Sequence, residues 1–133
     1  GIGEMLHQDL TEQVIGCAYK VHNSLGGGFL ESVYEKSLLI ELERSGLDCR
    51  YQVPLDVYYE GTRVGHFVAD VIVEDTIILE LKAVDELSKS HEVQLVNYLT
   101  ATGKPLGLLL NFGPKGVDIR RKVRDLSMLS SKS

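Results

Sequence analysis

Three strand-like segments follow one another with almost no chain between them. Each alternates apolar with other residues or is dense in β-branched side chains, and they cover residues 51–59, 64–73 and 76–84. Short turns at 60–62 and 74–75 join them. A parallel pair needs a crossover of about a dozen residues, so these segments can pair only as an antiparallel meander. Pro54 cannot donate a backbone hydrogen bond, which favours an edge strand or an interrupted one for the first segment.

Segments with helical periodicity flank this meander. Residues 10–25 and 30–45 precede it and 88–102 follow it, and glycines end the first two. The apolar run at 106–112 returns as a strand, and its distance from the third strand suits a parallel, right-handed crossover. A shorter strand-like piece covers 116–123. The expected fold is α/β (α+β), a mixed central sheet flanked by helices in the order α-α-β-β-β-α-β, with the last piece left open as a further strand.

Length and composition fit one globular domain. The chain has 133 residues, of which 44% are hydrophobic and 25% charged, so we expect a single domain over 1–133 with a flexible end at about 125–133. No apolar run approaches the roughly 20 residues of a membrane span, and the N-terminus lacks the features of a signal peptide. We therefore expect a cytoplasmic protein. Cys17 and Cys49 form no CxxC pair, which argues against a disulfide scaffold or a zinc site.

The charge balance bears on nucleic-acid binding. The net charge is −5 and the pI about 5.3, whereas dedicated nucleic-acid binders usually carry a basic face. This argues mildly against tight binding of DNA without metal, although carboxylates that hold a cation also make a chain acidic. Basic residues near the end of the chain could meet a phosphate backbone, but we favour a solvated terminal charge run. They are Lys115, Arg120, Arg121, Lys122 and Arg124.

Three charged residues interrupt two otherwise apolar strands. Asp70 lies in the second strand-like segment, and Glu80 and Lys82 lie two apart in the third, so the latter two point to one face. An ionised group taken out of water must be paired or coordinate a metal. Two carboxylates and one ammonium leave a residual negative charge, which a hard divalent cation such as Mg2+ would neutralise. The alternative is that all three are ordinary charges on a solvent-facing side, since half-exposed antiparallel strands are common.

Two helical segments carry further polar pairs. Gln94 and Tyr98 are four apart and share a helix face directly after the third strand. Gly28, Glu31 and Tyr34 have the spacing G-x-x-E-x-x-Y, in which Glu31 and Tyr34 also share a face. A half-exposed helix side would equally explain the first pair. A first-turn acid that favours its own helix through the helix dipole would explain Glu31.

Two histidines complete the candidates. His66 lies four residues before Asp70, on the same expected strand face, and could approach a metal. We favour a partly exposed strand histidine for this position. We expect His22 to pack near the end of its helix.

The ordered set of these residues resembles a known family. The core of the PD-(D/E)XK nucleases, in particular the RecB-like branch with its Q-x-x-x-Y helix, resembles the set Asp70, Glu80-x-Lys82 and Gln94-x-x-x-Tyr98. The Gly28/Glu31/Tyr34 pattern is similar to the signature of the small bacterial GxxExxY proteins, which are grouped with that superfamily. The resemblance covers residues 14–121. It departs from the family pattern at Ala69, where a proline would precede the aspartate.

The resemblance implies a restriction-endonuclease-like fold and a role for each residue. Asp70 and Glu80 would bind Mg2+ or Mn2+ together with the backbone carbonyl of Leu81. Glu31 would reach the same site as a direct or water-mediated ligand. Lys82 would orient and activate the attacking water. Gln94 and Tyr98 would brace the site or touch the phosphate strand.

Two functions from different classes stay open on the sequence. One is a metal-dependent nuclease that hydrolyses phosphodiester bonds in DNA or RNA, with DNA favoured. The other is a non-catalytic module on the same fold that binds nucleic acid or a protein partner. The acidic charge favours the module, whereas the complete set of Asp70, Glu80 and Lys82 weighs against it. A homodimer whose second copy completes a DNA groove is also expected, because so short a chain offers few elements that grip DNA, and no membrane association is expected.

Overall fold

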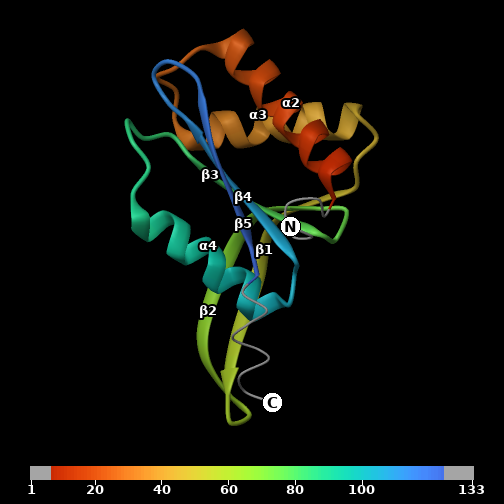
Figure 1. Ribbon diagram of the computed structural model, residues 1–133, viewed down its shortest axis with the longest axis vertical. Coiled ribbons are helices and arrows are strands. Elements are labelled where there is room, and N and C mark those ends of the chain that lie inside the picture. Colours follow the sequence, from red (N-terminus) through yellow and green to blue (C-terminus); the bar gives the residue numbers. More distant parts are fainter. Residues whose placement is uncertain (1–6, 125–133) are drawn as a thin grey trace.

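The computed structural model describes residues 7–124, and its elements follow in the predicted order (Figure 1). They are α2 (Gln8–Leu25), α3 (Glu31–Arg44), β1 (Cys49–Tyr59), β2 (Thr62–Val73), β3 (Ile77–Lys82), α4 (Lys89–Thr102), β4 (Leu106–Phe112) and β5 (Val117–Val123). The last strand, left open by the sequence, is present. The flexible end expected at 125–133 lies outside the described residues. Within 7–124, no helix has the length and hydropathy of a membrane span.

One five-stranded sheet, in the order β1-β2-β3-β4-β5, organises these elements. The first three strands form the predicted antiparallel meander. β4 lies parallel to β3 after the crossover through α4, and β5 returns antiparallel beside β4. β1 is an edge strand, as Pro54 indicated. The mixed sheet confirms the predicted fold class.

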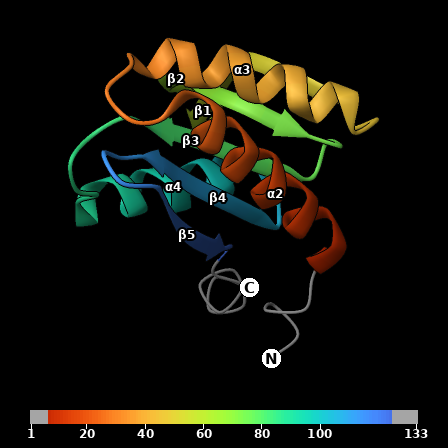
Figure 2. The same ribbon diagram turned by 90° about the horizontal axis from the view of Figure 1, so that it is seen from above.

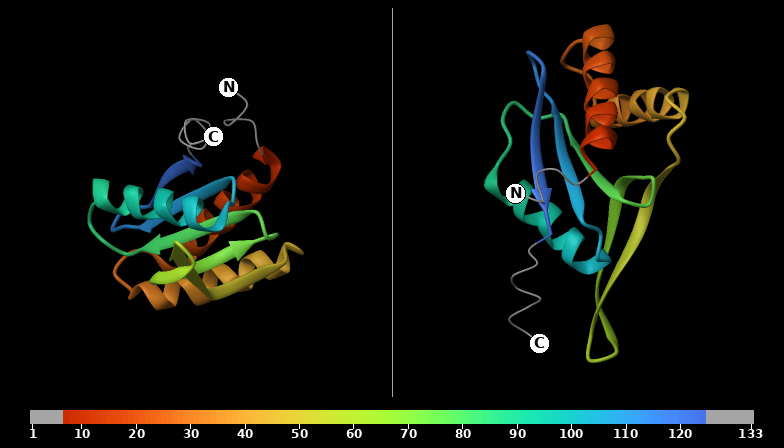
Figure 3. Two further views of the ribbon diagram at one scale, coloured as in Figure 1. Left: turned by 90° about the horizontal axis from the view of Figure 1, so that it is seen from below. Right: turned by 45° about the vertical axis from the view of Figure 1, so that its right-hand side comes forward.

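Helices cover both faces of the sheet, which lies between α3 and α4 (Figures 2 and 3). α2 and α3 pack on one face, where the core includes Leu79 and Leu81 of β3. α4 packs on the other face through Leu95 and Leu99. Because side chains alternate along a strand, Glu80 points to the side of α4 while its two neighbours enter the core under α2 and α3.

At Asp70 the side chains of the β1–β2 hairpin switch from one face of the sheet to the other. The pairing register is the same before and after this point, yet Gln52 of β1 and Asp70 of β2 are themselves unpaired. Gln52 has a φ of 50°, in the left-handed region that non-glycine residues rarely adopt. In consequence Val71 packs toward α2 and α3, whereas Ala69, two residues earlier, packs toward α4. Beyond this turn the hairpin projects from the rest of the sheet (Figure 1).

The loop between α2 and α3 is packed tightly against the chain that follows β4. A Cβ at Gly27 would lie 2.8 Å from both the Cα and the carbonyl oxygen of Pro114. These are backbone atoms, so they cannot move aside as the end of a flexible side chain could. The absence of a side chain at Gly27 therefore lets the loop approach closely, and this contact helps to set where α3 begins.

Replacing Gly27 by alanine should lower the free energy of unfolding by about 1–3 kcal/mol, the usual cost of overpacking a tight contact. The matched control is Gly16→Ala in α2, where a Cβ would meet nothing within 4 Å. Alanine there should raise the free energy of unfolding by about 1 kcal/mol through its better helix propensity. Urea unfolding of both variants measures the difference, and equal stabilities would contradict the tight contact.

Candidate functional site

Asp70 and Glu80 meet where the pairing of β2 with β3 stops. The last paired residues are Val71 and Leu79, and the next step of the ladder would pair Asp70 with Glu80. Side chains take over the hydrogen bonds at this step. The Asp70 amide donates to Glu80 Oε1 at 3.2 Å, and the Leu81 amide donates to Asp70 Oδ2 at 2.8 Å. The two carboxyl groups are thus fixed against each other by the backbone of the opposite strand.

Glu80 is a buried acid beside a second acid. Its side chain belongs to a residue that is only 6% exposed. Burial, followed by the negative charge of Asp70, raises the pKa of Glu80 to about 9, and the positive charge of Lys82 opposes this shift. At neutral pH and without a cation, Glu80 therefore keeps its proton. This is the behaviour expected of two carboxyl groups that share one site.

The charges of this pair also change the pKa values of Glu31 on α3 and Tyr98 on α4. Glu31 lies in the first turn of α3 and is half-buried. Burial and then the charge of Asp70 raise the pKa of Glu31, while Lys82 lowers it. Tyr98 of α4 is 5% exposed, and burial followed by the charges of Glu80 and Asp70 raises the pKa of Tyr98. The candidate site is therefore assembled from α3, β2, β3 and α4.

Lys82 and Gln94 are available for a ligand. Lys82 is half-buried, and within residues 7–124 it forms no ion pair, although its charge acts on Glu31 and Glu80. Gln94 lies one helical turn before Tyr98 and is exposed, and the described part of the chain gives its side chain no hydrogen bond. The Leu81 side chain is buried in the core, so only its backbone can take part in the site.

Tyr34, the last residue of the G-x-x-E-x-x-Y pattern, anchors the loop that leads into α3. Its hydroxyl donates to the carbonyl oxygen of Gly26 at 2.7 Å and accepts from the amide of Phe29 at 3.2 Å. The buried ring stacks on Phe112, with ring centroids 4.7 Å apart. Gly28 has a φ of 100°, which suits glycine. Tyr34 and Gly28 therefore shape the turn that presents Glu31, rather than contributing chemistry themselves.

The two histidines lie away from the carboxyl pair. His22 is buried near the end of α2, as expected, and its Nε2 lies 2.8 Å from the carbonyl oxygen of Gly113. His66 is an exposed strand residue, as favoured from the sequence, and it lies on the part of the hairpin beyond Asp70, where the side chains switch faces. Phe67, not His66, faces Tyr98, with ring centroids 5.3 Å apart. His66 instead lies 2.8 Å from Asp56, its partner on β1.

Two residues that the sequence reasoning missed belong to the same neighbourhood. Glu35 lies one helical turn after Glu31, and Asp70 is among the charges that act on it. Gln52 donates from Nε2 to Glu35 Oε1 at 2.7 Å. The four-residue spacing of Glu31 and Glu35 could have suggested the first. No sequence signal marks Gln52, because its place depends on the left-handed turn of β1.

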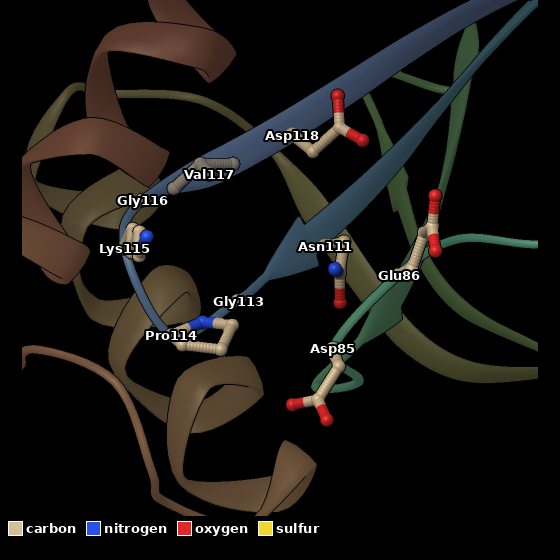
Figure 4. A pocket seen from close by; sticks show the side chains of 9 residues that line it. All are labelled: Asp85, Glu86, Asn111, Gly113, Pro114, Lys115, Gly116, Val117 and Asp118. Atoms are coloured by element: carbon tan, nitrogen blue, oxygen red, sulfur yellow. The ribbon is translucent and has the colours of Figure 1, made fainter.

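A surface hollow of about 490 Å3 lies beyond the end of β3 and is distinct from the carboxyl pair (Figure 4). Three carboxylates, of Asp85, Glu86 and Asp118, and the ammonium group of Lys115 line it, so its charge is negative on balance, and neither Asp70 nor Glu80 lines it. Asn111 in its wall is engaged by the backbone N–H and C=O of Val84, each at 2.9 Å. Such a negative lining repels phosphate, so this hollow is not the site we assign to the chemistry.

Few side chains of the described residues could bind a cation directly. Within residues 7–124, no three Asp, Glu, His or Cys side chains are arranged to hold a metal ion together. The carboxyl groups of Asp70 and Glu80 lie side by side, and the charge of Asp70 also acts on Glu31. Two protein carboxylates suit Mg2+, which usually keeps several waters and binds substrate phosphate rather than a full cage of side chains.

Comparison with known proteins identifies the family. A family model described as the PD-(D/E)XK nuclease superfamily matches residues 8–123. The chain belongs to this superfamily. The match covers every helix and strand of the structure, and it includes each residue placed in the candidate site. No curated protein matches the sequence.

Solved structures share the fold of this PD-(D/E)XK chain at low sequence identity. SSO0001 superposes with a TM-score of 0.58 at 17% identity, over 75% of this chain and 54% of that protein. The chain thus spans about half of SSO0001. The alkaline exonuclease LHK-Exo from Laribacter hongkongensis gives a TM-score of 0.51 at 11% identity, over 86% of this chain and 79% of that one. Its complex with dAMP gives 0.50 at 12% identity, over 91% and 86%.

The raised pKa of Glu80 predicts how the stability of the metal-free protein changes with pH. Between its ordinary value of 4.5 and about 9, the folded protein keeps the Glu80 proton while the unfolded chain has lost it. The free energy of unfolding should therefore fall as pH rises through this window. Glu80→Gln, which stays neutral, should flatten this fall and be the more stable protein at pH 8. Urea unfolding from pH 5 to pH 9 measures both.

The matched control for this experiment is Glu86→Gln, because Glu86 is exposed. It should follow the wild-type curve across the same pH range. A fall of equal size in wild type and Glu80→Gln would contradict the assignment of the buried proton to Glu80.

Proposed function

We propose that this chain is a metal-dependent nuclease that hydrolyses phosphodiester bonds in nucleic acid, with DNA favoured over RNA. The observation that carries the proposal is the carboxyl pair of Asp70 and Glu80 at the opened end of the β2–β3 ladder, with Lys82 two residues further on the same strand and without an ion pair among residues 7–124. Membership of the PD-(D/E)XK nuclease superfamily supports it.

The residues fit a divalent cation by their donor chemistry. Glu80 retains a proton only because a second acid and burial disfavour its charge, and a cation between the two carboxylates would take the place of that proton. Asp70 and Glu80 would hold Mg2+ or Mn2+, together with the backbone carbonyl of Leu81 and with Glu31 as a direct or water-mediated ligand. When bound, such an ion supplies charge neutralisation at the scissile phosphate and makes water more acidic.

The remaining side chains have separable roles. Lys82 carries the ammonium group nearest to this pair along the strand, so it would orient the attacking water and stabilise negative charge on the phosphate. The charges of Glu80 and Asp70 act on Tyr98, and Gln94 shares its face of α4, so both would contact the phosphate strand or brace the carboxylates. Gly28, Glu31 and Tyr34 support a place for the chain among the GxxExxY proteins, through a loop and helix that deliver Glu31.

The solved structures that share the fold bear on the substrate class. LHK-Exo is described as an alkaline exonuclease, and one of its structures holds dAMP. By analogy of fold, nucleic acid is the substrate class we assign to this chain. We also propose that 1–133 is one domain, that the protein acts in the cytoplasm, and that two copies associate to complete a groove for DNA.

A non-catalytic binding module on the same fold is the second candidate. The net charge of −5 and the acidic hollow beside β3 favour it, because both weaken the attraction of phosphate. The two candidates differ in whether the carboxyl pair takes up a cation. Calorimetric titration of the wild type with Mn2+ separates them, since a module without a metal site would show no binding at millimolar Mn2+.

Cleavage of single- and double-stranded DNA should require Mg2+ or Mn2+ and should depend on the assigned residues. Asp70→Asn and Lys82→Ala should each lower the cleavage rate by at least about a hundredfold, because they remove a ligand and the charge beside it. Asp75→Asn is the matched control. Asp75 lies in the exposed turn after β2 and pairs with Arg50 and Lys104, so its loss should leave the rate within about twofold. Metal-dependent cleavage that survives both site substitutions would reject this assignment.

A further inference from the structure

At the hairpin break opposite Asp70, an exposed side chain of the edge strand bonds to helix α3. Gln52, the unpaired residue of β1 at this point, donates from Nε2 to Glu35 Oε1 at 2.7 Å. Glu35 belongs to α3, the helix whose first turn carries Glu31. The bond therefore connects the strand break that presents Asp70 with the helix that presents Glu31.

The conformation of Gln52 is unfavourable unless its surroundings hold it. Its φ of 50° lies in the left-handed region, where a Cβ crowds the following carbonyl oxygen. Glycine adopts this conformation at no such cost, so the backbone alone would favour glycine at position 52. A non-glycine residue in this conformation, beside a candidate active site, is the pattern in which local strain accompanies function. What glutamine offers and glycine lacks is the amide that reaches Glu35.

Asp70 needs such support because neither neighbouring strand pairs with it in the regular way. Its position is skipped in the β1–β2 ladder and lies one step beyond the end of the β2–β3 ladder. Its amide and its carboxylate instead bond with Glu80 and with the backbone of Leu81. The direction of β2 at this point therefore depends on how β1 is turned at Gln52.

We propose that Gln52 and Glu35 are positioning residues of the nuclease site, whose hydrogen bond fixes the turn of the hairpin and so holds Asp70 in place to share a cation with Glu80. This inference rests on the proposed function for its cation. The bond acts through the backbone of β1 and β2, and neither residue touches the cation itself. Glu35 is engaged by Gln52, and within residues 7–124 no third acid joins Asp70 and Glu80 in a metal-holding cluster.

The experiment separates positioning from stability and from direct metal binding. Gln52→Gly removes the amide but accepts the left-handed backbone, so the fold should keep its thermal midpoint. Glu35→Ala removes the acceptor, whereas Glu35→Gln keeps an oxygen that Gln52 can bond. The metal-free readout is amide hydrogen exchange at Asp70 and Leu81, whose N–H groups bond the two carboxyl groups. The second readout is the dissociation constant of Mn2+ by calorimetry.

Gln52→Gly and Glu35→Ala should each speed exchange of the Leu81 amide by about tenfold, the equivalent of one net hydrogen bond. Both should weaken Mn2+ binding by about tenfold or more, as loss of an outer partner of a metal ligand does. Glu35→Gln should stay close to wild type in both readouts. The double variant should be no worse than either single one, because both substitutions remove the same bond.

Two results would overturn the proposal. Unchanged exchange at Leu81 in Gln52→Gly would show that Asp70 does not depend on this bond, whatever happens to Mn2+. A loss of Mn2+ affinity in Glu35→Gln as large as in Glu35→Ala would make the Glu35 carboxylate a ligand rather than a positioning group. A wild type that binds no Mn2+ but shows the predicted exchange changes would uphold the positioning of Asp70 and reject the proposed nuclease function.

Discussion

Two carboxyl groups that face each other across an opened pair of strands are the constraint on which the candidate site depends. Where β2 and β3 stop pairing, their backbone amides need new acceptors, and Asp70 and Glu80 supply them. The same contact brings two acids together away from water, which raises the pKa of Glu80 to about 9. The hydrogen bonds that complete the sheet therefore also bring two acids together, and a nearby positive charge would stabilise them. The charge of Lys82 does not suffice, because the pKa of Glu80 stays raised in its presence.

The fold around this pair brings side chains from distant parts of the chain close to Asp70 and Glu80. The tight contact of Gly27 with Pro114 and the bonds of Tyr34 fix the loop before α3, and this loop decides where Glu31 lies. The left-handed turn at Gln52 lies opposite Asp70, at the step where both are unpaired in the β1–β2 ladder, and under our proposal it sets the direction of β2 there. Neither device contacts the carboxyl pair, yet one lies beside Glu31, on which the charge of Asp70 acts, and the other lies opposite Asp70 itself. Stability and site geometry are thus linked at the loop and at the strand break.

Regular periodicity is what made much of the structure predictable. Glu80 faces α4 while Leu79 and Leu81 enter the core, as alternation requires, because β3 is regular throughout. The short turns forced the antiparallel meander in the same way. His66 is an exposed strand residue, as favoured, but the option that it shares a face with Asp70 extended that alternation across Asp70, where the side chains of the hairpin switch faces. A left-handed glutamine and its bond to Glu35 depend on tertiary contacts, and nothing in the local sequence distinguishes Gln52 from an ordinary strand residue.

The acidic character of the chain takes on a specific meaning under the proposed function. A net charge of −5 and a negative hollow beside β3 give nucleic acid little electrostatic reason to approach the metal-free protein. Uptake of a divalent cation at Asp70 and Glu80 would replace the Glu80 proton and leave the pair neutral instead of negative, with the charge of Lys82 beside it, at the place where phosphate must bind. Metal binding would then precede productive substrate binding, because the same two carboxylates that repel the phosphate when bare would hold the ion that attracts it.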